Sequence, residues 1–309
     1  MKLRSTIWLG IFCMGFGFGA GPLASPARAQ YGTAKSPQVP QEGQQGQQGQ
    51  QGQQTPDMAP PSGAIGQPPK TDPQEEAAYK ALHELKPTDA DKIIETGELF
   101  VQKYPNSHYL EAVYGRLTQA YFAKSQVAQG DAQKQALGKM YDCGDRALTA
   151  NPDDVDVLSL VGWVIPHSYD PNDMDAERRL AKAETYSKHA IDLLGNIQKP
   201  TGMTDEDFAK SKGSELAQAH SGLGLVYFRR GQYAESVGEL QKATEVATSP
   251  DPTDFYVMGL ELQQIKRFDQ AAQAYEKCSQ IQSGLQPRCK QGMEQAKKMA
   301  ASQPAPAKP

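Results

Sequence analysis

Apolar and small side chains recur at helical spacing over residues 74–300. The clearest example is residues 220–227, which read His-x-x-Leu-Gly-x-x-Tyr, because positions three and four residues apart share one face of a helix. The same order of side-chain types returns 35 residues later in residues 255–262, as Phe-x-x-Met-Gly-x-x-Leu. A second helical stretch follows each copy, so the pattern predicts an all-α fold of stacked helical hairpins.

Small residues mark the places where these helices are expected to cross. A small side chain at a crossing lets two helix backbones approach closely, while larger neighbours fill the space around it. Glycine inside a helix costs up to about 1 kcal/mol relative to alanine, so its use favours close approach. The predicted packing positions are Gly162, Ala183, Ala190, Gly224, Ser236, Ala243, Gly259, Ala271 and Cys278.

Insertions separate the units. The crossing residues of the two helices are 21 residues apart in the third unit and 12 apart in the last, so we expect an enlarged turn near 166–175. We also expect an enlarged turn at 128–133 and a loop at 196–213, with a short helix capped by Thr204. A terminal helix is expected because the last hairpin would otherwise leave an apolar face in water. The predicted units are 74–107, 108–152, 155–195, 217–250 and 252–285, with a capping helix at 287–300.

The two copies at 220–243 and 255–278 resemble the tetratricopeptide repeat. That family carries an aromatic residue, Leu-Gly and Tyr on the first helix, followed by Ala, an aromatic residue and Ala on the second. The resemblance implies a right-handed α-solenoid of tetratricopeptide-type helical hairpins with a C-terminal capping helix. It also implies that the first helices line a concave groove for a protein or peptide partner.

The resemblance places residues that flank the packed positions in this groove. Exposed apolar, aromatic and Arg side chains are the composition that anchors protein interfaces. The alternative is that Leu225 and Phe228 belong to the core. Leucine at positions 225 and 260, where members that bind chaperone tails carry Asn, argues against a clamp for a C-terminal carboxylate. The predicted groove residues are Ser221, Leu225, Phe228, Arg229, Tyr256, Leu260 and Gln263.

Residues 100–109, Phe-Val-Gln-Lys-Tyr-Pro-Asn-Ser-His-Tyr, are similar to the corresponding stretch in envelope-assembly lipoproteins and cell-division coordinators that carry these repeats. This similarity favours a role in the bacterial cell envelope. The sequence therefore predicts a non-enzymatic protein-interaction scaffold, periplasmic or extracellular, that binds a partner segment in its groove. The alternative is a structural component of an envelope complex that self-associates as a homo-oligomer.

The first 29 residues have the pattern of a secretory signal peptide. Lys2 and Arg4 precede an uncharged apolar run at 6–20, and small residues stand at the cleavage positions before residue 30. A retained membrane anchor is the rival interpretation, but the run is shorter than the roughly 20 residues that span a bilayer. After cleavage we expect no membrane span. Residues 30–73 are rich in Gln, Gly and Pro, which predicts a disordered linker, and residues 301–309 are predicted to be a disordered tail.

Charge and motifs narrow the range of functions. Residues 1–29 hold three basic and no acidic side chains, so their removal from the 32 basic and 36 acidic residues leaves a net charge of −7. A mildly acidic chain lacks the electrostatic signature of nucleic-acid binding. The five histidines do not have the spacing of a metal site, and no catalytic or nucleotide-binding motif is recognisable. We therefore expect no enzymatic activity, no cofactor and no metal.

Three cysteines follow the predicted signal peptide. Cys278 lies near the end of one predicted helix and Cys289 near the start of the next, so antiparallel packing could bring their Cα atoms within the roughly 4.4–6.8 Å that a disulfide needs. An exported chain meets an oxidising compartment. We therefore hypothesise a disulfide between them, which leaves Cys143 unpaired. The alternative is that Cys278 is only the small residue at a helix crossing.

Overall fold

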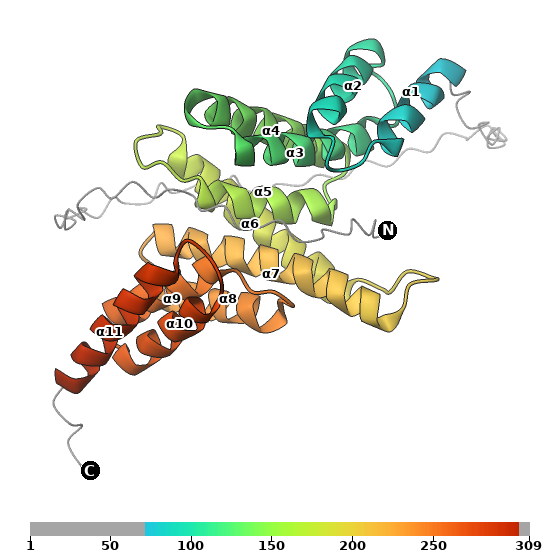
Figure 1. Ribbon diagram of the computed structural model, residues 1–309. Coiled ribbons are helices and arrows are strands. Elements are labelled where there is room, and N and C mark those ends of the chain that lie inside the picture. Colours follow the sequence, from blue (N-terminus) through green and yellow to red (C-terminus); the bar gives the residue numbers. More distant parts are fainter. Residues whose placement is uncertain (1–71, 303–309) are drawn as a thin grey trace, which may run out of the picture. The chain divides into compact units, whose positions relative to one another are not determined.

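The computed structural model describes residues 72–302 (Figure 1), and all the regular secondary structure of these residues is α-helical. The predicted signal peptide, the predicted linker up to residue 71 and the tail from residue 303 lie outside the described residues. The described helices are α1 (Pro73–Glu84), α2 (Ala90–Lys103), α3 (Leu110–Val127), α4 (Gly130–Ala150), α5 (Val155–His167), α6 (Ala176–Asn196), α7 (Asp205–Arg229), α8 (Tyr233–Val246), α9 (Pro252–Gln264), α10 (Phe268–Gln280) and α11 (Gln286–Ser302).

Successive helices pack as hairpins. α3 lies against α4, α5 against α6, α7 against α8 and α9 against α10, and these pairs follow one another along the chain in Figure 1. Neighbouring hairpins are joined where α5 packs on α7 and where α8 packs on α9, and α11 packs on α10. The prediction of an all-α fold built from sequential hairpins is therefore confirmed. The right-handed sense of the stack stays a prediction.

Side-chain caps fix the beginnings of the first helices of several hairpins. The backbone N–H of Val157 donates to Asp154 Oδ1 at the start of α5 (3.1 Å), and that of Thr253 donates to Asp251 Oδ1 at the start of α9 (2.8 Å). Thr204 caps α7, as predicted. Each cap satisfies a backbone N–H that has no partner inside the helix, and such a cap contributes about 1 kcal/mol.

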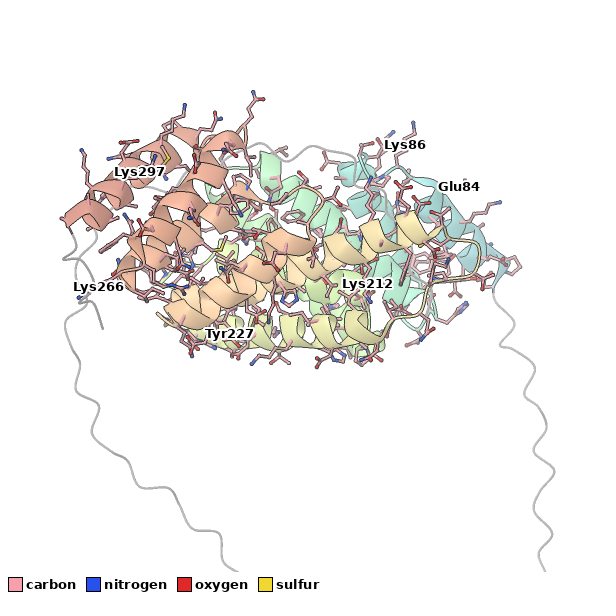
Figure 2. The ribbon with its side chains drawn as sticks, turned by 90° about the horizontal axis from the view of Figure 1, so that it is seen from below. Glu84, Lys86, Lys212, Tyr227, Lys266 and Lys297 are labelled. Atoms are coloured by element: carbon pink, nitrogen blue, oxygen red, sulfur yellow. A yellow bond between two sulfur atoms is a disulfide. The ribbon has the colours of Figure 1, made fainter. Side chains whose placement is uncertain are left out.

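The turns of the last two hairpins have the same backbone form. Gly231, between α7 and α8, has φ 74°, which is the left-handed conformation that its sequence context predicts. Lys266, between α9 and α10, lies 35 residues later and also has a positive φ, 60° (labelled in Figure 2). Since left-handed backbone is strained for a residue with a Cβ, the last hairpin keeps the turn at an energetic cost that glycine avoids.

Two of the predicted insertions are shorter as irregular segments than expected, because part of each is helix. α3 ends at Val127 and α4 begins at Gly130, so only residues 128 and 129 form the turn, and residues 130–133 extend α4 instead of enlarging it. In the predicted 196–213 loop, α6 ends at Asn196 and residues 197–204 are irregular, as expected, but the helix that Thr204 caps is not a short one: it continues as the 25-residue α7. Propagating an existing helix adds one hydrogen bond per residue, so an insertion without a helix breaker lengthens the helix. At 166–175, by contrast, α5 ends at His167 and an irregular segment does follow.

The buried apolar side chains form two clusters that meet on α7. The first cluster runs from Leu82 on α1 to Val226 on α7. The second runs from Leu225 on α7 to Ala296 on α11. Because Leu225 and Val226 are adjacent in sequence, α7 contributes to both clusters and joins the two halves of the described structure.

Candidate protein-binding surface

Glycines occupy helix crossings where a larger side chain would not fit. A Cβ built on Gly224 would lie 2.7 Å from Cδ2 of Leu240, and one built on Gly259 would lie 2.5 Å from Cε1 of Tyr275. Non-bonded carbon atoms attract best at about 3.5–4.0 Å, so these contacts would be repulsive. A Cβ on Gly162 would likewise meet Ser187 Oγ at 2.7 Å. The second-helix positions Ala183, Ala190, Ser236, Ala243, Ala271 and Cys278 are all buried.

Gly222 marks a further crossing that the sequence analysis missed. A Cβ built on it would lie 2.8 Å from the carbonyl oxygen of Gly162, so α5 and α7 cross with their backbones in direct contact. The signal was present as a second glycine two residues before Gly224. It was overlooked because the repeat pattern assigns that position no packing role.

Two of the predicted groove residues are wrong as partner contacts, because both are buried. The hydroxyl of Ser221 donates to Asp254 Oδ1 across 2.7 Å and thereby joins α7 to α9. Leu225 is 2% exposed and belongs to the second core cluster. The following hairpin covers these two positions, so at Leu225 the alternative of ordinary core is the correct one.

Four predicted groove residues remain partly exposed on α7 and α9. Phe228, Tyr256 and Leu260 pack against the second core cluster on one side only. Gln263 Oε1 accepts a hydrogen bond from the Tyr275 hydroxyl across 2.9 Å, which orients the amide. We call Phe228, Tyr256, Leu260 and Gln263 the α7–α9 surface. It presents two aromatic rings and one aliphatic side chain, while the Gln263 amide has its Nε2 buried and its Oε1 bonded to Tyr275.

Arg229 supports this surface and is not free to reach a partner. Its Nε donates to the carbonyl oxygen of Pro166 across 3.1 Å. Its guanidinium lies 5.3 Å from the ring centre of Tyr169 and 5.5 Å from that of Phe228. Burial lowers the pKa of Arg229 from its usual value. The contact with Tyr169 could not be predicted from the sequence pattern. Tyr169 lies in the irregular segment after α5, and the helix that it contacts, α7, begins 36 residues later.

Two carboxyl groups are buried on the face of α9 that packs against α7 and α8. Burial and the nearby carboxylate of Asp251 raise the pKa of Asp254 well above its usual value, although the Ser221 hydroxyl opposes the shift. The side chain of Glu261 is fully buried, and burial raises its pKa to about 8. The nearby Ser236 hydroxyl opposes this shift only in part, because it donates to the carbonyl oxygen of Gly224 and leaves both Glu261 oxygens without a hydrogen-bond partner. This environment therefore favours the protonated, neutral form. The sequence analysis did not single out either acid.

A hollow of about 230 Å³ lies between α6, α7 and α8. Inside it, His220 Nδ1 lies 2.6 Å from Glu239 Oε2, and Lys242 Nζ lies 2.8 Å from Glu239 Oε1. Glu239 is thus a shared partner of His220 and Lys242, so these polar groups are already paired at the position where the repeat carries an aromatic residue. Among residues 72–302 no three His, Cys, Asp or Glu side chains are grouped so that they could hold a metal ion.

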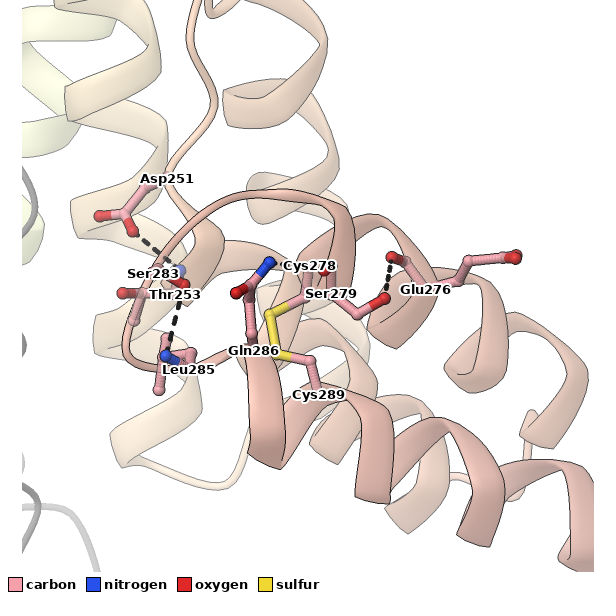
Figure 3. Close-up of a disulfide and its surroundings, with 9 residues drawn as sticks. All are labelled: Asp251, Thr253, Glu276, Cys278, Ser279, Ser283, Leu285, Gln286 and Cys289. Carbon is pink, nitrogen blue, oxygen red and sulfur yellow. Dashed lines mark hydrogen bonds between the residues drawn. A yellow bond between two sulfur atoms is a disulfide. The ribbon is translucent and has the colours of Figure 1, made fainter.

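Cys278 and Cys289 form a disulfide with their Cα atoms 5.8 Å apart. Figure 3 shows that it connects the end of α10 to the beginning of α11. On the same side, Gln286 Nε2 donates to the carbonyl oxygen of Ser279 across 3.1 Å. Cys143, on α4, is a free and buried thiol, and burial raises its pKa to about 11. A buried thiol with a raised pKa is a poor nucleophile.

Comparison with known protein families gives a match to the tetratricopeptide repeat over residues 255–284, which include most of α9 and all of α10. No curated protein is similar enough to count as a relative. Within residues 72–302, no helix combines the length and the apolar character needed to cross a membrane. Residues 72–302 thus form an all-helical array of sequential hairpins, with a tetratricopeptide repeat near the C-terminal end.

Proposed function

We propose that the chain is a non-catalytic scaffold of the bacterial cell envelope, periplasmic or extracellular, that binds a partner protein at the α7–α9 surface. The observation that carries the proposal is the match of residues 255–284 to the tetratricopeptide repeat, a repeat that commonly serves protein–protein interaction. Three of the four residues of the α7–α9 surface lie on the first helix of that repeat. Aromatic side chains half-set into a core are suited to this role, because they bring large contact area at little cost in conformational entropy.

The remaining parts of the proposal have separate supports. The envelope location rests on the apolar run at 6–20 and on the similarity of residues 100–109 to envelope proteins with these repeats. The non-catalytic assignment is supported by the pairing of His220 and Glu239 with each other and by the low nucleophilicity of Cys143. In each case the group that could do chemistry is already occupied or buried.

Crosslinking in intact cells that express the full chain tests the proposal. The captured protein is identified by mass spectrometry and quantified for the parent and for Tyr256→Ala. Removing a central aromatic anchor typically costs an interface at least about 2 kcal/mol, so we expect the capture of one defined partner to fall about 30-fold. Phe228→Ala should act in the same direction, and its melting temperature is measured because its ring also packs on the core.

Leu99→Ala is the matched control. Leu99 is 59% exposed on α2, so this variant also removes an exposed apolar side chain, but far along the chain from the repeat at 255–284. It should capture the partner at the level of the parent. If Tyr256→Ala and Phe228→Ala both fold and capture the partner as well as the parent does, the surface is assigned incorrectly.

A further inference from the structure

The terminal helix α11 packs on α10 but buries few of its side chains. Only Cys289 and Ala296 are buried among its 17 residues. Met293 is partly buried against the second core cluster, and a Cβ on Gly292 would lie 2.7 Å from Cζ of Tyr275, so the helix passes close to that ring. None of the ion pairs among residues 72–302 involves α11. Most of the surface of α11 is polar and exposed.

The disulfide adds a covalent link between α10 and α11 to these few buried contacts. It joins residues 11 apart in sequence at the point where the chain turns from α10 into α11 (Figure 3). Cross-linking a loop of about this length restricts the opened chain enough to change an opening equilibrium by about a hundredfold. Both cysteines are fully buried, so the bridge is also part of the packing between α10 and the first turn of α11.

We propose that α11 is a redox-controlled cap: it is closed over the last hairpin when Cys278 and Cys289 are bonded, and it opens when they are reduced. Opening uncovers the ring of Tyr275, which is 1% exposed in the closed form. The rest of the second core cluster draws on α7, α8, α9 and α10, so it stays folded without α11.

The chemistry is a two-electron thiol–disulfide exchange with a dithiol reductant. One thiolate of the reductant attacks the Sγ of one cysteine, and the Sγ–Sγ bond breaks to release the other cysteine as a thiolate. The second thiol of the reductant then displaces the first cysteine from the mixed disulfide. Two cysteine thiols and one oxidised reductant result, with two electrons and two protons transferred to the protein.

Hydrogen–deuterium exchange of the full chain, read by mass spectrometry, tests this cap. The oxidised parent is compared with the parent reduced by dithiothreitol and with a Cys278→Ala/Cys289→Ala variant, which needs no reductant to reach the buried bridge. We expect amides of α11 to exchange about a hundredfold faster in both unbridged forms. Amides of α9, in the same repeat, should keep their protection.

Cys143→Ala is the matched control, because it also removes a buried sulfur but leaves the bridge intact. It should leave the exchange of α11 unchanged. Equal protection of α11 with and without the bridge would overturn the proposal. So would loss of protection across α8, α9 and α10 together with α11, because the bridge would then hold the whole C-terminal half and not the cap alone.

Discussion

Glu261 gives the sharpest test of how α9 packs on its neighbours. Its carboxyl is fully buried, has no partner at either oxygen and has a pKa of about 8, against an ordinary value of 4.5. Between pH 4.5 and pH 8, Glu261 is protonated in the folded chain and ionised in the unfolded chain. The free energy of unfolding therefore falls as the pH rises from about 4.5 to about 8. Glu261→Gln removes the ionisation and keeps the shape of the side chain.

The magnitude follows from the pKa difference. Each pKa unit corresponds to 1.36 kcal/mol, so at pH 7 the ionisation linkage costs the parent about 3 kcal/mol that the Gln variant avoids. For a folded region of this size, 1 kcal/mol moves the melting temperature by about 2–4 °C. We therefore expect Glu261→Gln to melt about 6–12 °C above the parent at pH 7 and within about 2 °C of it at pH 4.

The assay is a series of melting curves of both proteins from pH 4 to pH 8.5. Other buried acids, such as Asp254, titrate in both proteins, so the difference between the curves isolates Glu261. Glu276→Gln, at an exposed site on α10, is the matched control and should change the melting temperature by less than about 2 °C throughout. A Glu261→Gln protein that melts at or below the parent at pH 8 would refute the reasoning, because the carboxylate would then be well solvated or paired.

Three further predictions concern the repeat geometry and are checked by urea unfolding at pH 7. Gly259→Ala should lower the free energy of unfolding by about 1–3 kcal/mol, because the new Cβ meets the buried Tyr275 ring. Gly238→Ala, on α8 with nothing within 4 Å of its added Cβ, should raise that free energy by about 0.5–1 kcal/mol. Equal effects of the two substitutions would contradict a close helix crossing at Gly259. Lys266→Gly should be neutral or stabilising by up to about 1 kcal/mol, since it relieves a left-handed residue, and a clear loss of stability would show that the turn has another form. Thr204→Ala should cost about 1 kcal/mol through loss of the α7 cap, and no change would mean that α7 begins later.

Sequence periodicity predicted the hairpins because the determinants are local. A glycine such as Gly224 or Gly259 tolerates no Cβ against the facing helix, and that requirement recurs 35 residues apart in the sequence itself. The lengths of α4 and α7 were not predicted in the same way. An insertion that interrupts the repeat pattern can form a larger turn or a longer helix. Which of the two forms depends on the packing of the neighbouring helices.

Only part of the candidate surface could be predicted from the sequence, because the exposure of a side chain depends on which helices pack over it. Ser221 and Leu225 occupy groove positions in the repeat pattern, yet α9 covers them, and Ser221 is bound to Asp254. Glu261 illustrates the opposite case, since glutamate is seldom fully buried and this one is. Such burial depends on the angle between successive hairpins, which the sequence of either hairpin alone does not specify.

The most direct test of the proposed function is site-specific photocrosslinking in cells, with a photoreactive amino acid at position 256 and, in a second strain, at position 99. We predict a crosslink to one defined partner protein from position 256 and none to that partner from position 99. A crosslink to the same partner from both positions, or from position 99 alone, would contradict a binding surface on the tetratricopeptide repeat.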